Sequence, residues 1–126
     1  MRKLLSIFVL VVISVSCEKN DSIPTRKVSY SVTGNYSGKL NIIYINTRGQ
    51  RDTAKSVSTP WTTEIIVADT VRTVSLIAST DTTITPGTSG QKVFAILKTG
   101  GVQRAQDTLT APASGRIQSR LLSHSF

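Results

Sequence analysis

Short runs in which apolar and polar residues alternate follow one another along most of the chain from residue 28 onward. The segment VSYSVT, residues 28–33, places its two valines and its tyrosine on one face. The segment VSLIAS, residues 74–79, does the same with its valine, leucine and alanine, and its isoleucine on the opposite face indicates a central strand. An alternation with period two is typical of a β-strand with a buried face, so both segments are predicted to be strands.

Further runs of the same kind are separated by residues that favour turns. NTRGQ at residues 46–50 is typical of a hairpin turn, and Gly100 and Gly101 can adopt the positive φ that tight turns need. TDTTITPGTSG, residues 80–90, is the longest polar stretch and is expected to be a loop. The other predicted strands are residues 39–45, 51–57, 61–67, 91–98, 102–109 and 116–122.

Trp61, the only tryptophan, follows a proline that suits the start of a strand. Trp61, Ile65 and Val67 fall on one face of WTTEIIV, so we expect Trp61 to be buried between two sheets. The 126 residues contain glutamate only at two positions and are rich in Ser and Thr, so strong helix formers are scarce. The pattern therefore predicts an all-β sandwich of about eight short strands.

The first sixteen residues have a different character. Arg2 and Lys3 precede an apolar run at residues 4–15, and the small Ser16 follows it. Charge, length and the small residue are typical of a secretory signal peptide that is removed. A membrane-spanning helix needs roughly 20 apolar residues, so the run is too short for one.

Cys17 is the only cysteine and directly follows this run, where the sequence resembles a bacterial lipoprotein signal. The resemblance implies that Cys17 becomes the lipid-modified first residue of the mature chain, although Ser14 replaces the usual aliphatic residue. The alternative is a cysteine that lies by chance near an ordinary cleavage site. The expected organisation is a signal peptide at 1–16, a lipidated cysteine and flexible tether at 17–27, and a β-sandwich domain at 28–126.

Glu18 follows the cysteine where many lipoproteins of the inner membrane have Asp, which favours the outer membrane. Removal of residues 1–16 takes two basic residues and no acidic one, and so lowers the net charge from +8 to +6. A basic exported domain meets anionic lipid headgroups, lipopolysaccharide or acidic glycans and no nucleic acid. The alternative is a basic surface that serves solubility alone.

Arg116, Gln118 and Arg120 alternate with less polar residues, so both arginines are expected to project from one face of the last strand. Together with Arg104 they form a candidate basic stripe for an anionic ligand. The alternative is that these charges discourage edge-to-edge aggregation.

Candidates for catalysis and metal binding are few. His124, the only histidine, lies next to the C-terminus, and no pair of acids has catalytic spacing. Four Asp-Thr pairs could suggest calcium, but Asp and Thr more often bond to the local backbone at turns. No enzymatic activity, cofactor or metal is expected. The pairs are Asp52-Thr53, Asp69-Thr70, Asp81-Thr82 and Asp107-Thr108.

Residues 28–126 resemble the MmpS family of small envelope proteins. The resemblance rests on the order of VSYSVTG from Val28, IIYINTRG from Ile42, TPW from Thr59, VSLIAS from Val74 and VFAILKTGG from Val93. It implies an extracytoplasmic immunoglobulin-like β-sandwich of about 7–8 antiparallel strands. Mycobacterial members act as accessory partners of large MmpL lipid and siderophore exporters. Two departures are Thr59, where the family usually has Leu, and a lipoprotein signal where those members have a membrane helix.

The sequence thus predicts a lipoprotein of the bacterial cell envelope, anchored through Cys17 and placed at the outer membrane. Its expected function is that of a non-catalytic accessory or interaction module whose partner is an envelope transport or assembly protein. The alternative function is the binding of an anionic glycan or lipid ligand.

Overall fold

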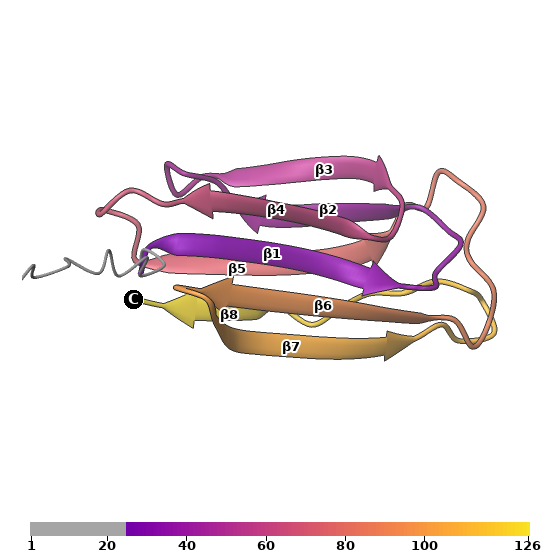
Figure 1. Ribbon diagram of the computed structural model, residues 1–126. Coiled ribbons are helices and arrows are strands. Elements are labelled where there is room, and N and C mark those ends of the chain that lie inside the picture. The colour runs from indigo at the N-terminus through magenta and orange to yellow at the C-terminus, as the bar shows by residue number, and fades with distance from the viewer. Residues whose placement is uncertain (1–24) are drawn as a thin grey trace, which may run out of the picture.

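Residues 25–126 are described by the computed structural model, and they form two four-stranded sheets that pack face to face (Figure 1). All strand pairs are antiparallel. The predicted β-sandwich is confirmed, while its finer description as immunoglobulin-like stays a prediction. The strands are β1 (Lys27–Gly34), β2 (Leu40–Ile45), β3 (Arg51–Val57), β4 (Trp61–Ile66), β5 (Thr73–Thr80), β6 (Lys92–Thr99), β7 (Val102–Thr110) and β8 (Leu122–Ser125).

The strand order is β4-β1-β6-β7 in one sheet and β3-β2-β5-β8 in the other. The central position predicted for residues 74–79 is confirmed, because β5 lies between β2 and β8. The hairpin predicted at residues 46–50 joins β2 to β3, and the turn at Gly100 and Gly101 joins β6 to β7 with φ of 57° and 78°. The sequence therefore predicts the local elements well.

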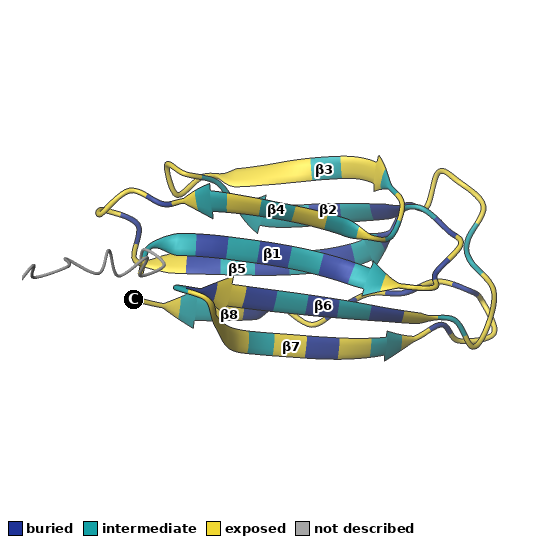
Figure 2. Ribbon diagram, viewed as in Figure 1, coloured by how far each residue is buried: buried dark blue, intermediate teal, exposed yellow. Residues whose placement is uncertain are grey.

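The core lies between the sheets and is formed by the alternating residues of the inner strands. Val28, Tyr30 and Val32 of β1 have no exposed surface, and the valine, leucine and alanine of β5 are equally buried. Burial alternates along β1, β5 and β6, whereas most of β3 and β7 is exposed (Figure 2). The apolar residues of the inner strands thus form one continuous core.

The sandwich has two ends with different connections (Figure 1). We call the end at which residue 25 lies the proximal end and the opposite end the distal end. The C-terminus also lies at the proximal end. The proximal end contains residues 46–50, 67–72, 100–101 and 126, and the distal end contains residues 35–39, 58–60, 81–91 and 111–121.

Two expectations for single segments need correction. Trp61 lies on the core side of β4 but is only half-buried, because β4 is an edge strand, and its ring packs 5.5 Å from that of Tyr44. The last strand spans Leu122–Ser125 and not residues 116–122. The earlier segment follows β5 without a regular ladder and leaves Leu121 60% exposed.

Candidate binding site

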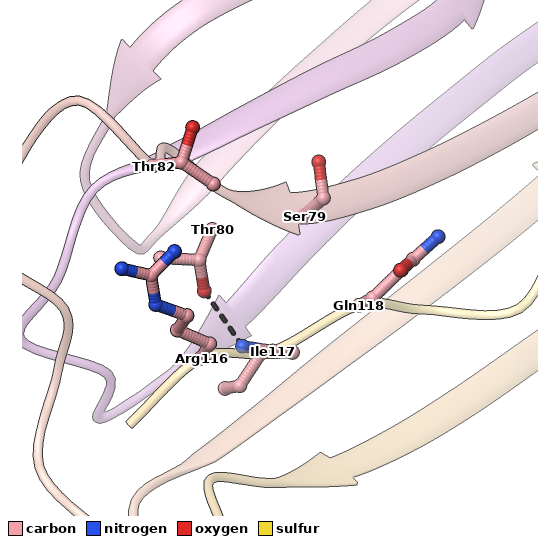
Figure 3. Close-up of a pocket in the computed structure, with 6 residues that line it drawn as sticks. All are labelled: Ser79, Thr80, Thr82, Arg116, Ile117 and Gln118. Carbon is pink, nitrogen blue, oxygen red and sulfur yellow. Dashed lines mark hydrogen bonds between the residues drawn. The ribbon is translucent and has the colours of Figure 1, made fainter. Parts of the chain in front are cut away.

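A hollow of about 410 Å³ opens at the distal end of the sandwich. It lies between the end of β5 and the segment that precedes β8 (Figure 3). The two sides come from parts of the chain that are more than thirty residues apart in sequence. The lining residues are Ser79, Thr80, Thr82, Arg116, Ile117 and Gln118.

Hydrogen bonds fix the second side of the hollow against β5. The Thr80 amide donates to the Ile117 carbonyl at 2.8 Å, and the Ile117 amide donates to Thr80 Oγ1 at 2.6 Å (Figure 3). Ser119 forms a similar pair of bonds with Ala78. The Ser119 amide donates to the Ala78 carbonyl at 2.8 Å, and the Ala78 amide donates to Ser119 Oγ at 2.8 Å. Ile117 and Ser119 face inward with 5% and 6% exposure. Arg116, Gln118 and Arg120, which alternate with them, are exposed, as the alternation in the sequence predicted.

Tyr36, which is only 4% exposed, contacts the hollow through Thr80, one of its lining residues. Its hydroxyl donates to the Gly115 carbonyl at 2.5 Å, accepts from the Gly87 amide at 3.0 Å, and lies 2.9 Å from Thr80 Oγ1. One phenol thus joins the loop after β5, the segment before β8 and the end of β5 itself.

Two glycines leave room for this tyrosine, and a third leaves room for the loop at residues 81–91. A Cβ at Gly38 or Gly87 would lie 2.7 Å or 2.2 Å from atoms of the Tyr36 ring. A Cβ at Gly115, which has φ of +68°, would lie 1.9 Å from the Gly87 carbonyl oxygen. The long loop at residues 81–91 is therefore packed closely against its neighbours. The sequence alone does not indicate this packing, because the partners of these glycines are distant along the chain.

Five of the six residues that line the hollow carry a side-chain group that can form hydrogen bonds. Thr82, Arg116 and Gln118 are exposed, and Ser79 is half-buried. Arg116 forms no ion pair with any residue of the described part of the chain. A guanidinium next to hydroxyl and amide groups can bind a carboxylate, a phosphate or the hydroxyls of a sugar. The site offers recognition chemistry and no nucleophile with a paired base.

Asp81 lies beside the hollow but is occupied by local bonds. It accepts hydrogen bonds from the Ser56 hydroxyl and from the hydroxyl and amide of Thr83. These bonds, with that of Ser56 the strongest influence, hold the pKa of Asp81 below its usual range. The carboxylate therefore stays ionised and fixes the start of the loop at residues 81–91.

The three arginines of the predicted stripe lie in different environments. Arg116 borders the hollow, while Arg120 lies 3.4 Å from Asp107, whose carboxylate also accepts the Arg120 amide at 2.9 Å. Arg104 donates through Nε to Thr99 Oγ1 at 2.9 Å near the other end of the molecule. The structure therefore does not bring Arg104 together with Arg116.

His124 and the aspartates of the Asp-Thr pairs do not converge. Burial and then the charge of Arg104 lower the pKa of His124, so its imidazole is neutral at pH 7. Asp81 and Asp107 bond to their own neighbours, and Asp52 and Asp69 lie exposed on other elements. Within residues 25–126, no group of three or more His, Cys, Asp or Glu side chains is placed to hold a metal ion.

A smaller hollow of about 250 Å³ lies on the outer face of the sheet that contains β1. Of its three charged residues, Lys27 and Glu64 form an ion pair at 3.1 Å and Lys98 has no ion-pair partner among the described residues. Because the hollow is smaller and two of its charged groups are already paired, it is a weaker candidate for a ligand than the one beside Arg116. The lining residues are Lys27, Ser29, Glu64, Lys98 and Gly101.

Cys17 and the signal segment lie outside the described residues. In the part of the chain that the structure covers, no helix has the length and apolar character needed to cross a membrane.

The model of a family described as "Mycobacterium membrane protein" matches residues 2–109. Among curated proteins, none matches the sequence. The family match covers Arg104 but ends before the segment that carries Arg116 and Arg120.

Proposed function

The chain belongs to the Mycobacterium membrane protein family, and from this premise we propose that it is a membrane-held accessory module of the cell envelope. The resemblance to MmpS proteins described above agrees with this membership. In the proposal, the β-sandwich contacts a component of an export or assembly machinery and performs no chemistry itself. The observation that carries the proposal is the division of the sandwich into a proximal end and a distal end (Figure 1).

The N-terminal chain meets the sandwich at the proximal end, so a membrane anchor would hold that end nearest the bilayer. A strand of eight residues such as β1 spans roughly 26 Å, which places the distal loops well away from the anchor. The distal end also carries the larger hollow and the long loop fixed by Tyr36. A rigid, exposed loop surface far from the anchor is suited to contact with a second protein.

We attribute the anchoring to lipidation of Cys17 after removal of residues 1–16. Support comes from the basic and apolar character of the leader and from the position of the cysteine directly after it. Two or three acyl chains would hold the protein stably, since each buried CH₂ contributes about 0.8 kcal/mol. Glu18 favours the outer membrane as the location.

The absence of catalysis is part of the proposal and rests on side-chain chemistry. His124, the only histidine, is neutral, half-buried and at the proximal end, away from the larger hollow. The hydroxyls that line this hollow have no base within hydrogen-bonding distance among the described residues. An unactivated hydroxyl is a weak nucleophile, so this site favours binding.

A second candidate function is the binding of an anionic glycan or lipid headgroup at the larger hollow. The observation that favours it is Arg116, which is exposed beside Thr82 and Gln118 and has no acidic partner in the described structure. This candidate differs from the first in that the bound group would be a small molecule, and membrane attachment would not be needed for binding.

Deletion and rescue distinguish the two functions. We expect deletion to cause an envelope defect that the wild-type chain rescues and a secreted, non-lipidated form rescues poorly, because anchoring raises the effective concentration near a membrane partner. Substitution of exposed Ile84 in the distal loop by Asp should also weaken rescue, while substitution of exposed Thr62 on β4 by Asp should not. Equal rescue by the secreted form would refute a membrane-partner role and support the small-molecule function.

A further inference from the structure

We propose that the proximal end of the sandwich is a contact surface for the anionic headgroups of the bilayer that holds the N-terminal segment. The inference rests on the proposed function only in that the chain is held at a membrane by residues before residue 25. It adds a second attachment, made by the folded domain itself, which would fix the orientation of the sandwich.

The turns of the proximal end form one connected surface. The Ala68 amide donates to the Thr47 carbonyl at 2.9 Å, which joins the turn after β4 to the hairpin after β2. The Phe126 amide donates to the Arg72 carbonyl at 2.9 Å, which adds the C-terminus. The Gly100 amide donates to the carbonyl of the first residue of β1 at 2.9 Å. A flat bilayer surface could therefore contact all of these segments at the same time.

Basic side chains predominate on this surface. Arg48, Arg51, Arg72 and Lys98 are exposed, and none of them forms an ion pair with a described residue. The acids nearby are Asp69 and Glu64, which pair with Arg26 and Lys27 at 3.8 Å and 3.1 Å, and the exposed Asp52 of β3. The four unpaired cations leave the proximal end with a positive surface that complements anionic lipid.

Exposed apolar side chains lie among these cations. Ile66, Val102 and Phe126 are 58%, 51% and 39% exposed, and they are three of the five large apolar residues that are exposed in the described chain. Protein surfaces that lie at the interface of a bilayer typically combine basic side chains with large exposed apolar side chains. At the distal end Ile84 and Leu121 are exposed, so the larger share of the exposed large apolar groups lies at the proximal end.

Arg26 holds the last of these apolar groups in place. Its guanidinium lies 4.4 Å from the centre of the Phe126 ring and donates to the Ala68 carbonyl at 2.6 Å and to the Val71 carbonyl. The first described residues are thus attached to the C-terminus and to the turn after β4. The point where the chain leaves for the membrane and the proposed contact surface consequently form one rigid unit.

The length of chain before the domain is compatible with this contact. From Cys17 to residue 25 the backbone can span at most about 28 Å. An anchor at Cys17 would therefore keep the proximal end within a few tens of ångströms of the headgroups. Weak individual attractions become effective under such confinement, because the second attachment is intramolecular.

Vesicle binding by residues 25–126 tests the surface without the anchor. This fragment contains every residue of the described core, which extends from Val28 to Leu122, and cooperative thermal unfolding is the check that each variant is folded. Sedimentation with vesicles of phosphatidylglycerol and phosphatidylcholine is compared with sedimentation with phosphatidylcholine alone. The test variant is Arg48→Gln with Arg72→Gln, and the matched control removes the same charge with Lys55→Gln and Lys92→Gln, away from the proximal end.

We expect binding to the anionic vesicles and little to phosphatidylcholine. At roughly fivefold for each basic side chain near the surface, the test variant should bind about 25-fold more weakly, and the control should change less than threefold. Equal losses in both variants would show a general effect of net charge and overturn the inference, as would an absence of binding to the anionic vesicles. In either case, full-length protein that still fractionates with membranes would leave the proposed anchoring intact.

Discussion

Tyr36 provides a test of the hydrogen bonds that hold the distal end together, and the other two tyrosines of the chain serve as controls. The main perturbation is Tyr36→Phe, which removes one oxygen and keeps the buried ring. The lost hydroxyl bonds to Gly115 and Gly87 and lies within 2.9 Å of Thr80 Oγ1. Two backbone groups in a region with little access to water would therefore lose their partner.

The expected cost follows from those partners. A hydrogen bond contributes about 1 kcal/mol net, and a buried polar group left unpaired costs about 1–3 kcal/mol. Thr80 Oγ1 keeps the Ile117 amide as a donor, so the main loss falls on the Gly87 amide and the Gly115 carbonyl. We expect Tyr36→Phe to lower the free energy of unfolding by about 2–4 kcal/mol, a large fraction of the stability of a small domain.

The other two tyrosines supply matched controls with the same chemical change. Tyr30→Phe removes a single bond, from the hydroxyl to the Ile45 carbonyl at 2.7 Å, so we expect a loss of about 1 kcal/mol. The hydroxyl of the half-buried Tyr44 bonds to no described residue, so Tyr44→Phe should change stability by less than about 0.5 kcal/mol.

Urea denaturation of residues 25–126 measures all three changes. With a slope of about 1–2 kcal/mol per molar urea, a loss of about 3 kcal/mol lowers the midpoint by roughly 2 M. Hydrogen exchange at the Gly87 amide should also accelerate in Tyr36→Phe beyond the change in global stability. The reasoning is refuted if Tyr36→Phe costs no more than Tyr44→Phe.

Three further outcomes are expected. Gly87→Ala should cost more in urea unfolding than the roughly 1–2 kcal/mol of backbone strain that a φ of +87° imposes on Gly90→Ala, because only the first new methyl meets the Tyr36 ring; a smaller cost at Gly87 would contradict this packing. Asp81, whose folded pKa lies below its unfolded value, contributes stability that is complete above about pH 4 and is lost as the pH falls through the folded pKa. Asp81→Asn should therefore be less stable than wild type at neutral pH and approach it in acid, and a constant difference would argue against this linkage. Metabolic labelling with a clickable fatty acid should mark the wild type but not Cys17→Ser, and label retained in the variant would exclude lipidation at that cysteine.

The positions of single strands could be predicted because alternation is a local property. Residues 28–33 and 74–79 carry their apolar side chains at every second position, and both segments became strands with that face buried. The pairing of β1 with β4 and β6 joins segments far apart in sequence. No local sequence pattern identifies which strands pair with each other, so the strand order of the two sheets could not be predicted from the sequence.

The two mistaken details have the same physical origin. The pattern around Trp61 correctly indicates which face turns inward, but the depth of burial depends on whether a neighbouring strand covers it, and β4 has none on one side. Residues 116–120 alternate as a strand does, yet two of their bonds to β5 use side chains, Thr80 Oγ1 and Ser119 Oγ, in place of backbone groups. Alternation predicts which side chains face the core, but it does not predict the regular ladder of backbone hydrogen bonds that defines a strand.

The candidate site was predictable only in part. Arg116 was expected to be exposed and to serve as a ligand group, and its exposure is confirmed. The hydroxyls of Ser79 and Thr82 that accompany it are more than thirty residues away in sequence, and the role of Tyr36 depends on glycines from separate loops. A tyrosine followed at short distance by a glycine carries no signal of that arrangement.

The contrast between the two ends gives the fold its functional meaning. At the distal end, Tyr36 and its glycines hold the loops through internal bonds, so a partner or ligand meets a surface that is already ordered and loses little entropy on binding. At the proximal end, Arg26 joins the start of the domain to Phe126, while neighbouring cations stay unpaired and exposed. A rotation of the sandwich about its tether would remove those cations from anionic lipid. If the proposed contact holds, headgroup binding at one end therefore directs the hollow at the other end away from the membrane, which makes the lipid composition a determinant of partner access.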